Sequence, residues 1–284
     1  GKAYIEGMSG LWCTGLGYGN KELIECATEQ MSRLYFAHLF GGRSHEPAIG
    51  LAEKLKALAP CPTSKVFFTN SGSEANDTQV KLAWYYNNAR GKPKKKKIIS
   101  RQRAYHGTTV AAGSLTGLKA FHADFDLPIA GILHTDCPHY GKYAEAGESE
   151  TDYSARLAAN LEDLIQKEGP DTVAAFIAEP VMGAGGVVLP PKGYFEKVEA
   201  ILAKYDIAFI ADEVICGFAR TGNWWGAQTF GFTPTSISLA KAVTSAYVPL
   251  GALTIAPGVY EVIEAASGRH GMFAHGFTYS GHPL

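Results

Sequence analysis

Lys241 is the residue whose position first suggests chemistry. It follows the apolar run 236–240, and apolar sequence resumes at Val248, which places the lysine at the end of a buried strand. A lone lysine is more often a surface residue, because lysine is rarely buried without a partner. In a dry cleft, however, a lysine amine has a lowered pKa and attacks carbonyl groups. Lys241 is therefore a candidate for forming a Schiff base with an aldehyde.

Acidic residues follow two other apolar runs of strand length. Residues 207–211 lead into Asp212, and residues 173–178 lead into Glu179. A carboxylate at the end of a buried strand is costly unless a cation or a hydrogen-bond donor meets it. The structural explanation for Asp212 is an ion pair with a residue such as Arg220, and the functional explanation is contact with a cationic ligand. The residues alone leave both open.

A further strand-length run, residues 65–69, leads into the sequence Asn-Ser-Gly-Ser-Glu-Ala at residues 70–75. Gly72 allows close approach of the backbone, and the helix predicted to follow presents free N–H groups to an anion. The segment suggests a phosphate site. Taken alone, it is better explained as an ordinary helix start with Ser73 as the capping residue. It matches neither a P-loop nor a G-x-G-x-x-G fingerprint, so it does not indicate a nucleotide.

The elements that must position these residues alternate along the chain. Short, nearly all-apolar strands separated by helices are typical of a parallel sheet covered on both faces, so we expect a three-layer α/β/α fold with a mostly parallel central sheet. Ligands bind past the carboxyl ends of the strands in such sheets, where the candidate residues fall. The expected strands are residues 65–69, 97–100, 131–135, 173–178, 207–211, 236–240 and 251–256. The expected helices are residues 21–34, 47–57, 73–88, 154–167, 193–205 and 258–266. We expect residues 136–152 to form a long excursion and the glycine-rich residues 183–186 a turn.

The composition is that of an ordinary globular protein. The 284 residues are 46% hydrophobic and 19% charged, and the formal net charge is −1, so no overall field attracts nucleic acid or an anionic membrane. The basic run at residues 92–97 is short and lacks aromatic residues, and we interpret it as a solvated lead-in to a strand. No apolar stretch approaches the length of a membrane span, and the first residues do not resemble a signal peptide.

The five cysteines form no C-x-x-C pair and have no His-rich neighbourhood. This pattern argues against both a zinc site and a disulfide framework. Together with the lack of a signal-like segment, it predicts a cytoplasmic protein with reduced thiols and no metal.

The chain resembles the class III (omega) aminotransferases, a family of fold type I pyridoxal-phosphate enzymes. Seven segments carry the resemblance in the expected order, and they span nearly the whole chain. They are Gly-Leu-Trp-Cys at 10–13, residues 70–77, Tyr-His-Gly at 105–107, Ala-Glu-Pro at 178–180, residues 211–222, Ala-Lys at 240–241 and His-Gly-Phe-Thr-Tyr-Ser-Gly-His-Pro at 275–283. The resemblance implies the large domain of a pyridoxal-phosphate-dependent transferase and pyridoxal 5'-phosphate as cofactor.

The resemblance also implies a role for individual residues. Lys241 would hold the cofactor as a Schiff base and then move the proton as base and acid, and Asp212 would pair with the pyridinium nitrogen. Tyr105 would stack on one face of the ring and Val214 on the other. The remaining implied residues are Gly72 and Ser73 at the phosphate, His106 and Glu179 in the cofactor site, Thr278 at the phosphate of the neighbouring subunit, and Trp12 and Phe40 in the substrate pocket. Ordinary hydrophobic packing explains Phe40 nearly as well.

The implied activity is transfer of an amino group from an omega-amino acid, a diamine or a simple amine to pyruvate or a similar keto acid, in a homodimer with composite active sites. Residues 1–45 would belong to the small-domain and substrate-pocket region, and residues 46–284 to the large domain. The family continues past the Gly-His-Pro motif into a C-terminal small domain. One alternative is therefore a truncated, non-catalytic cofactor-binding fragment. Another is an aminomutase or decarboxylase on the same fold.

Overall fold

The computed structural model describes residues 1–284 and contains one seven-stranded sheet with the order β1-β7-β6-β5-β4-β2-β3. The strands are β1 (Lys65–Thr69), β2 (Lys97–Arg101), β3 (Ile132–Thr135), β4 (Val173–Ala178), β5 (Ala208–Asp212), β6 (Ser236–Leu239) and β7 (Gly251–Ile255). Strands β3, β2, β4, β5 and β6 pair in parallel, whereas β7 is antiparallel to both β6 and β1. The expected mostly parallel sheet is confirmed, with β7 as its antiparallel strand.

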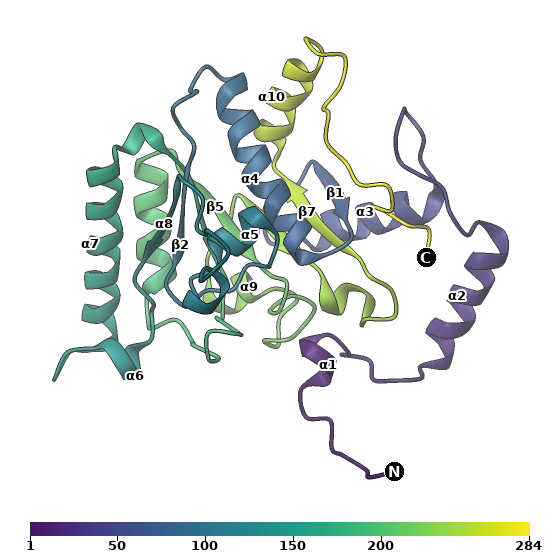
Figure 1. The fold of residues 1–284 in the computed structure, drawn as a ribbon, viewed down its shortest axis with the longest axis horizontal. Coiled ribbons are helices and arrows are strands. Elements are labelled where there is room, and N and C mark those ends of the chain that lie inside the picture. Colours follow the sequence, from purple (N-terminus) through teal and green to yellow (C-terminus); the bar gives the residue numbers. More distant parts are fainter.

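Helices cover both faces of this sheet (Figure 1). The longer ones are α2 (Lys21–Arg33), α3 (Glu46–Leu58), α4 (Gly72–Ala89), α7 (Glu150–Glu168), α8 (Tyr194–Lys204) and α10 (Pro257–Ser267). The short ones are α1 (Ser9–Trp12), α5 (Val110–Leu115), α6 (Tyr140–Tyr143) and α9 (Gly226–Phe230), and 3-10 turns occur at Lys119–Phe121, Pro170–Thr172 and Lys241–Thr244. No helix combines the length and hydropathy that a bilayer span requires.

Strands β4 and β5 show why the fold has three layers. Phe176 and Phe209 pack into the cluster that includes residues of α7 and α8, whereas Ile177 and Ile210 pack on the opposite face against Val80 of α4. Successive side chains of a strand point to opposite faces, so a run that is apolar throughout needs a helix layer on each side. The expected three-layer α/β/α fold is confirmed.

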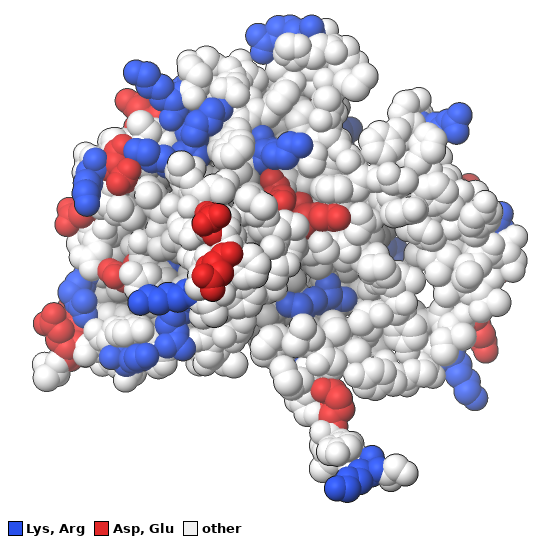
Figure 2. Space-filling model, viewed as in Figure 1, with Lys and Arg blue, Asp and Glu red and all other residues white.

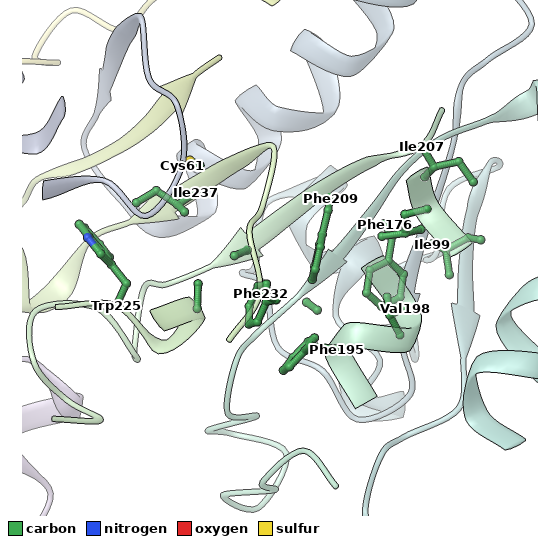
Figure 3. Close-up of a cluster of buried hydrophobic side chains, with 14 of the residues drawn as sticks. Cys61, Ile99, Phe176, Phe195, Val198, Ile207, Phe209, Trp225, Phe232 and Ile237 are labelled. Atoms are coloured by element: carbon green, nitrogen blue, oxygen red, sulfur yellow. The ribbon is translucent and has the colours of Figure 1, made fainter. Parts of the chain in front are cut away.

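The larger core lies on the α7 and α8 face (Figure 3). Three phenylalanine rings stack there: the Phe195 and Phe232 centroids are 4.2 Å apart, and those of Phe232 and Phe209 are 4.9 Å apart. Trp225 is fully buried in the same cluster, and its indole N–H donates to the carbonyl of Leu58. This packing fixes β5, whose last residue belongs to the site described below.

Most predicted elements begin and end within one or two residues of the observed ones, and residues 183–186 form a turn as expected. Helix α7 is the main difference, since it begins at Glu150 rather than residue 154. Ser149 caps it early, because the Ser149 hydroxyl accepts a hydrogen bond from the Asp152 N–H at 3.1 Å. The expected excursion over residues 136–152 therefore contains α6 and the start of α7.

Residues 1–45 extend away from the sheet (Figure 1). Helices α1 and α2 contain no buried residue, and His45 is the first buried residue of the chain. Hydrogen bonds from the Leu16 and Asn20 N–H groups to the side chains of Ser245 and Tyr247 attach this segment to the rest. The predicted domain boundary between residues 45 and 46 stays a prediction.

Candidate active site

The candidate site lies at the carboxyl ends of three neighbouring parallel strands. Asp212 ends β5, Glu179 directly follows β4, and Lys241 comes two residues after the end of β6. All three line one cavity of about 120 Å³. Its other lining residues are Gly72, Ser73, Tyr105, His106, Gly107, Val214, Ile215 and Ala240. Apart from Thr278, every residue predicted to hold the cofactor therefore lines the same cavity.

Lys241 is held in an uncommon backbone conformation at this cavity. Its φ is +51°, in the left-handed region that residues other than glycine rarely adopt, so the backbone is constrained at this position. Burial lowers the pKa of the Lys241 amine, and the carboxylates of Asp212 and Glu179 act in the opposite direction with smaller effect. A lowered pKa enlarges the fraction of neutral amine, which is the form that attacks a carbonyl.

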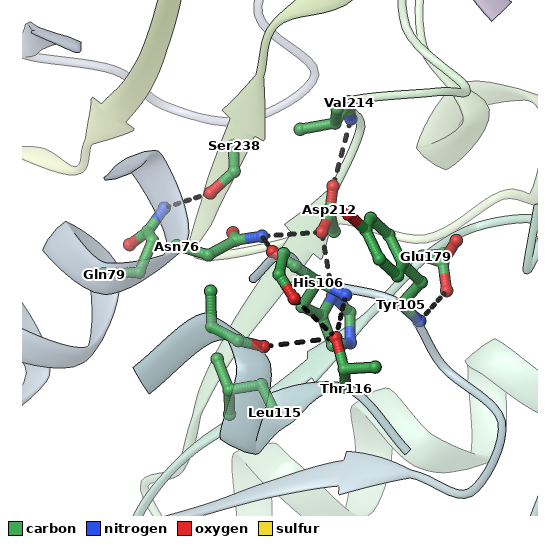
Figure 4. Close-up of polar contacts among 12 residues, drawn as sticks. Asn76, Gln79, Tyr105, His106, Leu115, Thr116, Glu179, Asp212, Val214 and Ser238 are labelled. Atoms are coloured by element: carbon green, nitrogen blue, oxygen red, sulfur yellow. Dashed lines mark hydrogen bonds and ion pairs between the residues drawn. The ribbon is translucent and has the colours of Figure 1, made fainter. Parts of the chain in front are cut away.

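Asp212 is fixed by three hydrogen bonds (Figure 4). Its Oδ2 accepts from Asn76 Nδ2 and His106 Nδ1, both at 2.8 Å. Its Oδ1 accepts from the Val214 N–H at 3.1 Å. The three donated hydrogen bonds hold this buried carboxylate in one orientation, in which it can face a cationic ligand. Arg220, the structural partner considered above, is exposed, and the partners of Asp212 lie elsewhere.

His106 acts on the site through Asp212. Its side chain is fully buried, and only the tautomer with a proton on Nδ1 can donate to Asp212 when the ring is neutral. Its backbone is held on both sides, since its N–H donates to Thr116 Oγ1 at 2.9 Å and its carbonyl accepts from Asn76 Nδ2 at 2.7 Å. The ring therefore orients the acid, whereas the resemblance placed His106 among the cofactor-binding residues.

The start of α4 forms the anion-binding side of the cavity. Ser71 is the capping residue, because its hydroxyl accepts a hydrogen bond from an N–H of the first turn at 3.2 Å. The alternative with Ser73 as the cap is wrong, since α4 begins at Gly72; the Ser73 hydroxyl instead accepts from the Thr108 N–H at 3.2 Å. The first N–H groups of a helix lack intrahelical partners, so this end can bind a phosphate.

Two glycines keep the cavity open. A Cβ atom on Gly72 would lie 2.9 Å from Cγ2 of Val214, and one on Gly107 would lie 2.5 Å from the Ser73 hydroxyl oxygen. Gly107 also has a φ of +137°, which a residue with a side chain rarely adopts. The space they leave lies between an anion-binding helix start and a fixed acid, beside a lysine amine. These groups fit pyridoxal phosphate: the helix start can bind its phosphate, the acid can face its basic ring nitrogen, and the amine can meet its aldehyde.

Glu179 and Tyr105 form another wall. The buried Glu179 carboxylate accepts hydrogen bonds from the N–H groups of Tyr105 and Gly183, both at 3.0 Å, and burial raises its pKa. The Tyr105 ring packs edge-on against Phe121, with centroids 5.4 Å apart. Burial, with the nearby carboxylates, raises the pKa of Tyr105, so this residue is a neutral phenol at physiological pH. Stacking of Tyr105 on a cofactor ring stays a prediction.

Three sequence-predicted residues lie outside the lining of this cavity. The Trp12 ring centroid is 5.9 Å from Lys241 Nζ, so the indole lies on the lysine side of the site. Phe40 packs against the C-terminal segment, where a Cβ atom on Gly276 would be 2.7 Å from its ring. Thr278 is exposed. The predicted roles of Phe40 in the substrate pocket and of Thr278 at a neighbouring subunit stay predictions.

The segment that carries Thr278 is attached to α4 through His275. The His275 ring nitrogens lie 2.9 Å from Thr78 Oγ1 and 2.8 Å from Lys81 Nζ, and the ring stacks on Phe67 with centroids 5.3 Å apart. Burial and the Lys81 charge lower the pKa of His275 to about 4, so the ring is neutral at physiological pH. The helix that begins at the anion-binding end thus also holds this segment.

Sequence reasoning assigned no role to Asn76 or Gly107. Asn76 donates to Asp212, which lies 136 residues further along the chain. Its spacing could have indicated a role, because Asn76 follows Gly72 and Ser73 by one helical turn and so shares their face of the helix. The sequence could not distinguish Gly107 from the other glycines, because its close approach to Ser73 is visible only in the fold.

Comparison with solved structures shows that this fold is similar to those of proteins named as transaminases. A structure titled "Transaminase with L-ala" matches 100% of this chain and 67% of its own chain, with a TM-score of 0.98 and 58% identity. The omega transaminase from Pseudomonas jessenii in complex with PMP matches 100% of this chain and 62% of its own, with a TM-score of 0.99 and 56% identity.

The chain belongs to the class III aminotransferase family, whose model, "Aminotransferase class-III", matches residues 1–284. Members of this family use pyridoxal phosphate, so the predicted family and its cofactor are confirmed. Among curated proteins, the mitochondrial gamma aminobutyrate transaminase 1 of Solanum lycopersicum is 56% identical over 285 residues, covering 100% of this chain and 55% of the relative. The chain therefore spans about half the length of the curated relatives that it matches.

Proposed function

We propose that the protein to which this chain belongs is a pyridoxal-phosphate-dependent aminotransferase. It would transfer the amino group of an omega-amino acid, a diamine or a simple amine to pyruvate or a similar keto acid. The observation that carries the proposal is the single cavity lined by Lys241, Asp212 and the start of α4 at Gly72. The names of the relatives support the donor class, because gamma-aminobutyrate is an omega-amino acid.

Lys241 would attach the cofactor covalently as a Schiff base. When bound, pyridoxal phosphate supplies an electron-accepting ring that stabilises negative charge on the substrate carbon. The Lys241 amine would also hold and return the proton of that carbon. Its lowered pKa suits this role, because a base works best when its pKa lies near the working pH.

The other residues would bind and orient. Asp212 would accept a hydrogen bond from the protonated ring nitrogen, while Asn76 and His106 keep its carboxylate in place as positioning residues. The N–H groups of the first turn of α4 and the Ser73 hydroxyl would bind the phosphate. Tyr105 and Val214 would exclude water from the two sides of the ring.

The proposal is tested by loading the purified protein with pyridoxal phosphate and recording its visible absorbance. We expect a visible band that bleaches when gamma-aminobutyrate or another amine donor is added and returns with pyruvate. Lys241→Ala should show only the spectrum of free cofactor, and the matched control Lys56→Ala, on the exposed side of α3, should behave like the unmodified protein. Absence of the band at every pH would reject the proposal.

A second candidate is that this chain binds the cofactor without catalysing amino transfer, because the cavity residues alone would allow binding. It predicts that the 284-residue chain captures the cofactor without transferring amino groups. Pyruvate-dependent turnover by these 284 residues would count decisively against it. Product analysis separates an aminomutase or a decarboxylase, because neither consumes a second keto substrate.

We also propose a homodimer with composite sites. Support comes from large apolar side chains left exposed beside Thr278 and elsewhere, such as Tyr279 (65% exposed) and Phe125 (69% exposed). Mixing the variants Lys241→Ala and Thr278→Ala should restore activity, because one site of the mixed dimer would then be intact. No recovery after confirmed subunit exchange would contradict composite sites.

The proposed compartment is the cytoplasm, supported by the five free cysteines. The names of two tomato relatives include mitochondrial and chloroplastic locations. Cell fractionation decides the matter, and enrichment of the protein in an organelle would contradict the proposal.

A further inference from the structure

A second cavity lies at the opposite end of the sheet from the candidate active site. Its volume is about 280 Å³, compared with about 120 Å³ for the active-site cavity. It is formed where Ala208 and Ser236 begin β5 and β6, beneath the last turns of α4 and α8. The proposed function uses none of its residues.

The interior of this cavity is apolar. Hydrocarbon side chains line it, among them Leu82, Leu202, Ile207, Ile210, Ile255 and Val259. The polar residues beside them are already paired: Gln79 Oε1 accepts from the Ser236 hydroxyl at 3.1 Å, and Asn87 Nδ2 donates to the Ala83 carbonyl at 2.8 Å. A dry apolar cavity of about 150 Å³ holds a benzene ring, so this one has room for an aromatic ring and a short chain.

The mouth of the cavity carries excess positive charge. The Asp206 carboxylate lies 2.7 Å from the Arg90 guanidinium, 2.9 Å from Lys92 Nζ and 3.9 Å from Lys95 Nζ. A second carboxylate, Asp171, also acts on the charge of Lys95, so three cations and two anions leave a formal charge of +1. The carboxyl ends of α4 and α8 each contribute about −0.5 and the amino end of α10, at Ala256 of the lining, about +0.5, so a positive charge of roughly one half remains. Figure 2 shows Lys and Arg side chains at the upper left, where α4 ends, with acidic side chains among them.

We propose that this cavity binds a compact apolar carboxylate, with its hydrocarbon part inside and its carboxylate beside Arg90 and Lys92. Apolar burial supplies the affinity, and the uncompensated positive charge selects an anion over a neutral molecule of the same shape. The inference is independent of the proposed function, because the two cavities share no lining residue.

The test uses the cofactor-loaded protein with its isoleucine δ1-methyl groups labelled for NMR. Ile207, Ile210 and Ile255 line the second cavity, and Ile215 lines the active-site cavity, so the two sites report separately. We expect 3-phenylpropanoate to shift the first three signals at millimolar concentration or below. The alcohol 3-phenylpropan-1-ol should bind several-fold more weakly. Equal binding of the two probes would overturn the anion class, and a shift of Ile215 alone would overturn the site.

Two variants sharpen the test. Lys92→Met removes one partly exposed charge and should weaken 3-phenylpropanoate about twofold to fivefold while leaving the alcohol unchanged. Ala203→Phe fills the cavity and should abolish both. The matched control Lys56→Met should bind like the unmodified protein. If Ala203→Phe does not fold, Lys92→Met remains decisive, because an equal affinity of that variant and its control for 3-phenylpropanoate would contradict the proposal.

Discussion

Strand β5 contributes to two regions of opposite character. Phe209 packs into the aromatic core with Phe195 and Phe232 (Figure 3), and three residues later Asp212 enters the polar network with Asn76 and His106 (Figure 4). The core is held by close contact between rings, and the buried Arg101 guanidinium at its edge lies 5.8 Å from the centre of the Phe195 ring. The network holds a buried carboxylate by directed hydrogen bonds.

Some strained or unpartnered groups lie in the network or beside it, and others lie elsewhere, such as Tyr85 Oη and Arg101 Nε. Asn76 Oδ1 and His106 Nε2 are buried without a hydrogen-bond partner, and Lys241 has a positive φ. Each of these features destabilises the folded chain by about 1–3 kcal/mol unless a ligand or water meets it. The comparison indicates that the core provides the stability with which the network is held in place for chemistry.

The largest expected effect is on stability. Phe232→Ala should lower the free energy of unfolding by about 3–5 kcal/mol, because it leaves a cavity among stacked rings. The affinity of the folded protein for pyridoxal phosphate should change less than about twofold. Urea denaturation and cofactor titration measure the two quantities, with the exposed Leu189→Ala as control. A large loss of cofactor affinity without loss of stability would break the comparison.

The next effect is on catalysis. Asp212→Asn should lower kcat/KM of the full-length protein by roughly 10²–10³-fold, because a fixed charge facing the ring nitrogen is lost. The free energy of unfolding should also fall by about 1–3 kcal/mol, because the NH2 group of an asparagine would face N–H donors that now bind Asp212. Asp126→Asn, at an exposed position, is the control. If Asp212→Asn is instead fully active, the acid has no role in the chemistry.

A pH effect is expected from Glu213, which is fully buried and accepts hydrogen bonds from the Ala227 and Gly226 N–H groups at 2.7 and 2.9 Å. Burial raises the pKa of Glu213 to about 7. The folded chain binds this proton more tightly than the unfolded chain. The contribution of Glu213 to the free energy of unfolding is therefore fully present below about pH 4.5 and is lost as the pH rises to about 7.

The size of that loss is about 3 kcal/mol for a shift of this magnitude. Glu213→Gln removes the titration, so the free energy of unfolding of the unmodified protein should fall by about this amount relative to the variant between pH 4.5 and 8. Denaturation at several pH values measures the difference. Parallel pH profiles of the two proteins would show that Glu213 does not titrate in this range.

The smallest expected effect is that of a positioning residue. Asn76→Ala removes one of the hydrogen bonds that hold Asp212 and should lower kcat/KM about tenfold, since a hydrogen bond to a charged group contributes about 1.5 kcal/mol. The matched control is Asn160→Ala, because Asn160 donates to Asp136 at the surface at 2.7 Å. An equal loss in both variants would mean that the effect is not transmitted through Asp212.

Much of the fold was predictable because the signals were local. The apolar runs at residues 65–69 and 173–178 coincide with β1 and β4, since strands buried on both faces must be apolar throughout. The antiparallel direction of β7 was not predictable, because direction depends on pairing with distant strands. Helix α9 was missed because it has five residues, and Glu213, thirteen residues earlier, holds its first N–H groups.

The site residues also divide into those that the sequence could identify and those that it could not. Lys241 and Asp212 could be found because a charged residue after an apolar run is unusual in itself. The cap at Ser71 could not be separated from Ser73, because both are serines beside Gly72 and the choice depends on where the first helical turn forms. Asn76 is an ordinary helix residue until the fold brings it to Asp212.

The central claim is that the Lys241 amine, and no other, carries the cofactor. The most direct test is to load the protein with pyridoxal phosphate, reduce it with borohydride, digest it and locate the added mass by sequencing the labelled peptide. We predict one label per chain, on Lys241, and none in the Lys241→Ala variant. A label on another lysine, or full activity of the variant, would contradict the account.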